Sequence, residues 1–209
     1  LFAELQQKMK DRVLQLRRPN STAPRPYDNE LVPAISVSPI TAGVEWKTYE
    51  QTFPWVPELT RLTNFSSGTT NRPTVAIRPR DNDIGLLFTG YIVAPANGDY
   101  TFFMSADTGA LLRLHDATVI DADYGYVGGS EISATIKLQA GLHPFRLYYA
   151  RQSAGVPSLN LSWSGPGFSK QPIQDGAFRR DGIGAPTPPT AVDDVVSTLQ
   201  NVAVSIPVL

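Results

Sequence analysis

The residues that could do chemistry gather in one stretch, MSADTGALLRLHDATVIDAD, at positions 104–123. Asp107 and Asp121 stand near the ends of a short hairpin-like unit within it. Carboxylate oxygens can hold a hard cation such as calcium, and they accept hydrogen bonds from sugar hydroxyls. Aspartate also caps turns through its own backbone. The stretch therefore predicts either a binding site or two plain turns.

A second loop, DADYGYVGG at 121–129, adds two tyrosines to its carboxylates. Tyrosine rings stack on sugar faces, and neighbouring carboxylates accept from sugar hydroxyls. We therefore expect a ligand site between the turn at 105–109 and this loop. Its candidate ligand-binding residues are Asp107, Asp121, Asp123, Tyr124 and Tyr126, and the three aspartates are also the candidate metal ligands. The alternative is a solvated loop whose tyrosines pack on the end of the fold.

Catalysis has little support in the sequence. The two histidines are His115 and His143, and no nucleophile-elbow signature accompanies them. The absence of cysteine removes thiol nucleophiles, disulfides and thiolate metal sites. The turn RDNDIG at 80–85 begins like a calcium loop, but the twelfth position counted from Asp81 is Ile92, where such a loop needs glutamate. We expect no enzyme activity within this chain.

Composition narrows the class of partner. The formal net charge is −1, which gives no basic footprint for a nucleic acid. No apolar run reaches about 18 residues, so we expect no membrane span. The 209 residues suffice for one domain of ordinary size with appendages. The first residue is leucine and the last residues stop within an apolar run, so we expect the chain to be a piece of a larger protein.

The elements that must position these residues are short strands. Six runs alternate with period two and are rich in β-branched and aromatic side chains, with glycine, asparagine and aspartate between them. These runs are 86–93, 99–105, 110–114, 133–138, 144–150 and 158–163. Such spacing predicts an all-β fold, an antiparallel β-sandwich. The side chains expected to share one core are Phe102, Leu112, Leu114, Leu138, Leu147 and Trp163.

The flanking segments differ from this pattern. Residues 1–18 predict an amphipathic helix, the possible end of an upstream domain, whose apolar stripe needs a covering partner. That stripe comprises Phe2, Leu5, Met9, Val13 and Leu16. We expect a Pro-rich connector at 19–37, the sandwich at 38–178, a Pro-rich linker at 179–190 and the truncated start of another β module at 191–209.

A longer pattern spans the middle of the chain. In order it comprises AGVEWKTYE, FPWVPELTRL, GLLFTGYIVAPANGDYTFFMSADTGALLRLHDATVIDAD, ISATIKLQAGLHPFRLYYARQSAGVPSLNLSWSGPG and KQPI. From about residue 38 to residue 173, this order and spacing resembles the protective-antigen-type β-sandwich module, the PA-fourteen domain. The resemblance implies an antiparallel sandwich that is usually found outside the cell. It also implies sugar recognition as the commonest role, often beside glycosidases, sulfatases, adhesins or toxins.

The same resemblance implies a metal. Its sugar-binding members carry two consecutive aspartates, joined by a cis peptide, where this chain has Ala106 and Asp107. Those aspartates chelate one calcium, which in turn holds sugar hydroxyls. With one carboxylate missing, the resemblance implies weak calcium binding here. It also places Trp46, Trp55 and Trp163 at framework positions, in the core or at the sandwich edge.

The two ends give a context. The helix at 1–18 looks like the last helix of a sulfatase-type hydrolase, and 191–209 is similar to the start of cadherin-like or immunoglobulin-like repeats. Together they imply an exported bacterial multidomain protein, located in the periplasm, at the cell surface or outside the cell. We predict a non-catalytic carbohydrate-binding accessory module, with a polysaccharide or glycan and a neighbouring domain as partners. The alternative is a structural spacer that packs on a catalytic domain and binds no ligand.

Overall fold

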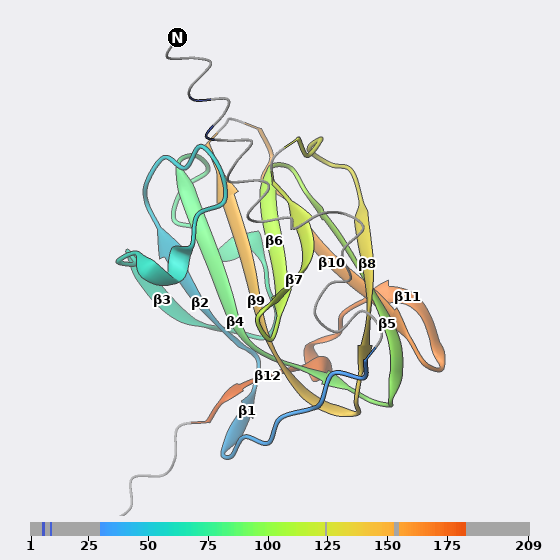
Figure 1. The fold of residues 1–209 in the computed structure, drawn as a ribbon. Helices are drawn as coiled ribbons and strands as arrows, with labels where there is room; N and C mark the ends of the chain where they lie inside the picture. Colours follow the sequence, from blue (N-terminus) through green and yellow to red (C-terminus); the bar gives the residue numbers. More distant parts are fainter. Residues whose placement is uncertain (1–5, 7–8, 10–29, 124, 153–154, 183–209) are drawn as a thin grey trace, which may run out of the picture.

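The computed structural model describes residues 6, 9, 30–123, 125–152 and 155–182. Within those ranges the strands lie in two antiparallel sheets (Figure 1). The predicted all-β antiparallel sandwich is therefore confirmed. Of the predicted helix at 1–18 only Gln6 and Met9 are described; both are helical, and Met9 is 62% exposed. The rest of that helix, and the partner expected to cover its stripe, lie outside the described residues.

The larger sheet centres on two long strands, β4 and β9, that pair along their whole length from Ile84–Arg151 to Ala94–Gly141. Its main path, in spatial order, is β1 (Ile40–Ala42), β12 (Phe178–Asp181), β4 (Ile84–Ala94), β9 (Gly141–Arg151), β6 (Gly109–Leu114) and β7 (Ala117–Ala122). Strand β2 (Val44–Tyr49) also pairs with β4 and carries β3 (Ser66–Thr70) on its other side.

The smaller sheet has the spatial order β11 (Phe168–Pro172), β10 (Leu159–Gly165), β5 (Gly98–Ala106) and β8 (Ile132–Leu138). Three short 3₁₀ turns connect strands: η1 (Leu59–Arg61), η2 (Val75–Ile77) and η3 (Asp175–Ala177). No helix among the described residues is long and apolar enough to cross a membrane.

The main core lies between the two sheets. Strand β5 shows the expected alternation of inward and outward side chains. Its inward residues Tyr100, Phe102, Met104 and Ala106 are fully buried, and the residues between them are not. All six side chains predicted to share one core belong to it and are at most 5% exposed. The inward face of the sandwich was therefore correctly predicted.

A second, smaller core lies on the outer face of the larger sheet, and the alternating pattern did not anticipate it. Phe53, Val56 and Leu59 recur at spacings of three in the segment after β2, and all three are buried. They pack over outward residues of the sheet such as Leu87 and Leu111. This cluster fixes the segment 50–62 against the sheet.

Two stretches expected to be connectors contribute to the sandwich. Val32, within the predicted connector 19–37, is 1% exposed and exchanges backbone hydrogen bonds with Lys137 and Gln139. Strand β12 extends to Asp181, inside the predicted linker 179–190. Pairing with β1 and β4 holds this strand in the sheet.

Candidate functional site

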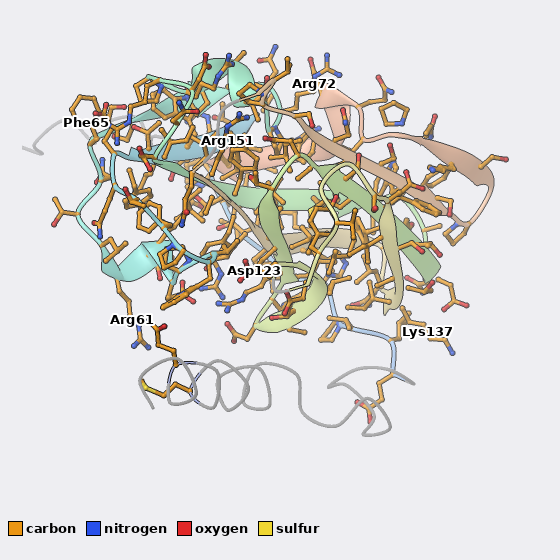
Figure 2. The ribbon with its side chains drawn as sticks, turned by 90° about the horizontal axis from the view of Figure 1, so that it is seen from above. Arg61, Phe65, Arg72, Asp123, Lys137 and Arg151 are labelled. Carbon is orange, nitrogen blue, oxygen red and sulfur yellow. The ribbon has the colours of Figure 1, made fainter. Side chains whose placement is uncertain are left out.

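Four segments meet at one end of the sandwich: the segment after β2, the β5–β6 turn, the β7–β8 loop and the β9–β10 loop. Backbone hydrogen bonds join Asp107 to Ser158 and Gly129 to Ala106. Figure 2 looks down on the molecule from the upper end of Figure 1, and it shows Asp123 and Arg151 within the outline, whereas Phe65 and Lys137 lie toward the periphery. Of the five candidate residues, Asp107, Asp123 and Tyr126 lie in these neighbouring loops.

Asp107, in the β5–β6 turn, is held by three internal donors. The Tyr149 hydroxyl and the Ser158 backbone N–H each donate to Oδ1 at 2.8 Å. Arg151 donates from Nη1 to Oδ2 at 2.6 Å. The carboxylate is 20% exposed and the guanidinium 1% exposed. Both oxygens of Asp107 are therefore used within the protein.

Strand register explains this contact. Gly109, at the start of β6, pairs with Ala150 in β9, so the end of β9 lies beside the turn that carries Asp107. Side chains two apart on a strand share a face, which brings Tyr149 and Arg151 to the same carboxylate. Burial raises the pKa of Tyr149 to about 12, and the hydrogen bond to Asp107 adds to this effect. Tyr149 is therefore a neutral donor at any physiological pH.

Ala106 is engaged as fully as its neighbour. Its N–H donates to the Tyr126 hydroxyl at 3.0 Å, and its carbonyl accepts from Gly129 N–H at 2.7 Å. The same hydroxyl lies 2.9 Å from the Ala106 carbonyl and 2.5 Å from that of Ser130. The Ala106 side chain is fully buried in the main core. Tyr126 thus fastens the β7–β8 loop to the turn.

Asp123 fixes a different pair of segments. Both its carboxylate oxygens lie 3.2 Å from the backbone N–H of Val56, on the segment after β2. A Cβ on Gly109 would come within 2.9 Å of this carboxylate, so a larger residue there would require the Asp123 side chain to shift. Asp121 lies in strand β7 opposite Leu111, not in the loop where the sequence placed it. Tyr124 lies outside the described residues.

The calcium set expected from the sequence does not form an oxygen cage. Calcium needs six to eight oxygen ligands. Asp107 and Asp123 accept from separate protein donors, and a guanidinium stands where a cation would neutralise Asp107. Within the described ranges, no group of three or more His, Asp or Glu side chains could hold a metal ion. The peptide bond between Ala106 and Asp107 is trans.

Three exposed apolar side chains, which we call the rim, adjoin these contacts along the chain. Trp55 is 51% exposed, Val127 70% and Val156 85%. Each adjoins a residue that ties the loops together: Val56, Tyr126 and Gly155 respectively. Trp46 and Trp163 pack against the main core, whereas Trp55 is not part of it. The sequence did not suggest Trp55 as a binding residue. Its exposure could have been inferred only from its position between Phe53 and Val56, whose side chains face the sheet.

A hollow of about 340 Å³ lies on the outer face of the larger sheet, away from the loop end. Tyr91, Arg146 and Asp116 are among the residues that line it. His115 also lines it and contacts the fully buried His143, with 2.9 Å between Nε2 and Nδ1. Burial lowers the pKa of both histidines, and for His115 the neighbouring ring lowers it further. Two charged side chains that line the hollow, Arg146 and Asp116, form an ion pair with each other at 2.8 Å.

The fold and the loop end define a class: a two-sheet antiparallel β-sandwich whose connecting loops converge at one end. Residues 41–177 match the model of the PA14 domain. The chain belongs to this family, which is the PA-fourteen family that the sequence resembles. No curated protein matches the chain.

Solved structures show the same fold at low identity. The A domain of epithelial adhesin 9 from Candida glabrata, solved with Galβ1-3GlcNAc, has a TM-score of 0.55 at 16% identity and covers 78% of this chain and 98% of that one. The PA14 domain of the antifreeze protein MpAFP has a TM-score of 0.54 at 14% identity, covering 73% and 98%. An anti-sigma factor domain-containing protein from Clostridium clariflavum has a TM-score of 0.53 at 22% identity, covering 66% of this chain. This chain spans only 47% of that bacterial protein.

Proposed function

We propose that this domain is a non-catalytic carbohydrate-binding module whose ligand contacts the exposed rim at the loop end, with Trp55 as its stacking surface. The observation that carries the proposal is a half-exposed tryptophan beside the residues that join the loops. Indole and phenol rings offer large apolar faces that suit the C–H faces of sugar rings. The structures solved with galactosides share this fold, which supports the choice of ligand class.

The position of Trp55 is fixed before a ligand arrives. Its neighbours Phe53 and Val56 are buried in the second core, and the Val56 N–H binds Asp123. Further along, Glu58 accepts from Tyr148 at 2.8 Å and from Arg113 at 2.6 Å. A surface that is already ordered loses less conformational entropy on binding. The rim is therefore organised for binding, although no exposed residue of it carries a charge.

The wider setting is part of the same proposal. A module of this kind would hold a neighbouring domain on its polysaccharide, in an exported bacterial protein such as a sulfatase or a glycosidase. The support for that setting is the sequence of residues 1–18 and 191–209, of which the structure describes only Gln6 and Met9. A parent hydrolase would supply the catalysis, and this domain would supply the contact with substrate.

The test begins with a glycan array probed with the whole chain, followed by calorimetric titration of the strongest ligands. Galβ1-3GlcNAc and lactose are natural first ligands, together with acidic and sulfated polysaccharides. We expect Trp55→Ala to weaken binding by about 10–100-fold, as for a central aromatic contact. Phe65→Ala is the control, since Phe65 is 64% exposed and lies at the edge of the molecule in Figure 2, away from Asp123.

Fluorescence gives an independent measurement. Trp163 is 5% exposed and Trp46 packs against the core, so Trp55 contributes most of the quenching by acrylamide. A bound glycan should reduce that quenching. If no glycan binds, or if Trp55→Ala and Phe65→Ala bind equally well, the spacer function replaces this proposal.

A further inference from the structure

We propose that Arg151 is a built-in cation at the loop end, so that this domain holds its loops, and recognises its ligand, without calcium. The second half of that statement rests on the proposed function. The first half stands on the contacts of Arg151 alone.

A buried arginine needs compensation for the hydration it loses, and here the compensation comes from the loops. Nη1 donates to Asp107 at 2.6 Å, and Nη2 donates to the carbonyl of Gly155 at 2.9 Å. One planar group thus joins a carboxylate in the β5–β6 turn to a carbonyl in the β9–β10 loop. A calcium ion joins segments in the same manner, through carboxylate and carbonyl oxygens. The guanidinium provides the positive charge that these oxygens need.

The loop around Arg151 is shaped to this contact. Gly155 has φ of +128°, a conformation that other residues rarely adopt, and it turns its carbonyl toward Nη2. Three residues later, Ser158 donates its N–H to Asp107, so the β9–β10 loop contacts both members of the pair. The carboxylate and the guanidinium are both largely removed from solvent.

These contacts occupy the oxygens of Asp107 and Ala106 that a calcium ion in this turn would need. Both oxygens of Asp107 accept from protein donors, and a divalent ion beside them would face a buried positive charge. The carbonyl of Ala106, the next oxygen along the chain, accepts from Gly129 and lies within reach of Tyr126. Both carboxylate oxygens of Asp107 and the carbonyl of Ala106 are thus occupied by this chain's own donors. Arg151 is a positioning residue, and Asp107 is its partner instead of a ligand contact.

The first experiment measures thermal unfolding of the whole chain in 5 mM EDTA and in calcium from 0.1 to 10 mM. We expect the two melting temperatures to agree within about 1 °C, since a ligand that does not bind the native state cannot stabilise it. A saturable rise of several degrees below 1 mM calcium, abolished in Asp107→Asn, would overturn the proposal. This measurement needs no glycan, so it remains decisive even if the proposed function fails.

The second experiment removes the cation. Arg151→Met leaves the largely buried Asp107 carboxylate without its cation, and we expect the melting temperature to fall by roughly 6–20 °C. Asp116→Asn is the matched control: Asp116 also pairs with an arginine, at 2.8 Å, but it is 99% exposed, so its loss should change the melting temperature by less than about 3 °C. Equal effects of the two variants would refute a special role for Arg151.

Two further variants keep the test informative if Arg151→Met does not fold. Asp107→Asn retains an acceptor for Tyr149 and Ser158 but removes the charge, so its melting temperature should fall well below that of Asp116→Asn. The double variant Asp107→Asn/Arg151→Met should lose less than the two single losses combined, because neither charge is left alone. Strict additivity would contradict a direct pair. For any glycan that binds, equal affinity in EDTA and in calcium is expected, and a tenfold loss in EDTA would contradict the inference.

Discussion

Glu58 should make the stability of this domain depend on pH in a narrow acidic range. Its Oε1 accepts from Thr60 at 2.6 Å and from Tyr148 at 2.8 Å, and its Oε2 accepts from Arg113 at 2.6 Å. Partial burial alone would raise the pKa of this carboxyl group. The hydrogen bonds and the charge of Arg113 outweigh that effect and lower the pKa from 4.5 to about 2.

The magnitude follows from linkage between protonation and folding. A pKa lowered from 4.5 to about 2 corresponds to at most about 3.4 kcal/mol of stability when the carboxylate is charged in both states. The side chain is 31% exposed, so solvent screening reduces this to about 1–2 kcal/mol. The sign is that of a lowered carboxyl pKa: the contribution is complete above about pH 5 and is lost as the pH falls from about 4.5 to 2.

The experiment compares the whole chain with Glu58→Gln by urea denaturation at pH 7, 5, 4 and 3. Glutamine keeps the shape and one acceptor but loses the charge. We expect the variant to be less stable by about 1–2 kcal/mol at pH 7, and the difference to shrink steadily below pH 4.5. Asp116→Asn serves as the control for general acid effects. A difference that is zero at pH 7, or that stays constant down to pH 3, would refute this account of the Glu58 network.

Two other variants test the core and the loop end. Leu147 is fully buried and pairs with Phe88 and Leu112. In urea denaturation, Leu147→Ala should lower the free energy of unfolding by about 2–5 kcal/mol. A loss below about 1 kcal/mol would mean that the site does not belong to a closely packed core. Tyr126→Phe removes the hydroxyl that pairs with Ala106, so we expect a loss of about 1–3 kcal/mol and faster hydrogen exchange in the 105–109 turn. Unchanged exchange there would show that other contacts hold the loop.

The fold was predictable because its signal is local. Alternating runs such as 99–105 and 144–150 identify strands and their inward faces one residue at a time. Turn residues between the runs then place Asp107 and Asp123 at the ends of strands. The second core was harder to see, because Phe53, Val56 and Leu59 lie in a segment without strand periodicity and are covered only when the segment folds back over the sheet.

The chemistry of the candidate site was less predictable because it depends on pairs that are distant in the sequence. Asp107 and Arg151 are 44 residues apart, and only the pairing of β6 with β9 brings them together. A signal was nevertheless present in the run LYYAR. An arginine at the end of an apolar strand is expected to be partly buried and therefore to need an acceptor or a carboxylate as its partner. Carboxylates on adjacent loops indicate a metal site from the sequence alone, whereas the contact with Arg151 is visible only once β6 and β9 are paired.

The charges at the loop end explain why membership in the PA14 family does not by itself define a ligand. Several carboxylates on adjoining loops would repel one another unless a cation or hydrogen-bond donors compensate. This chain compensates Asp107 with Arg151 and Asp123 with a backbone N–H, so for these two carboxylates the compensation is internal. In the proposed function, a partner would then meet the exposed apolar side chains, of which Trp55 is the largest. Recognition by such a surface depends on stacking and shape, because its polar groups are already committed to holding the loops.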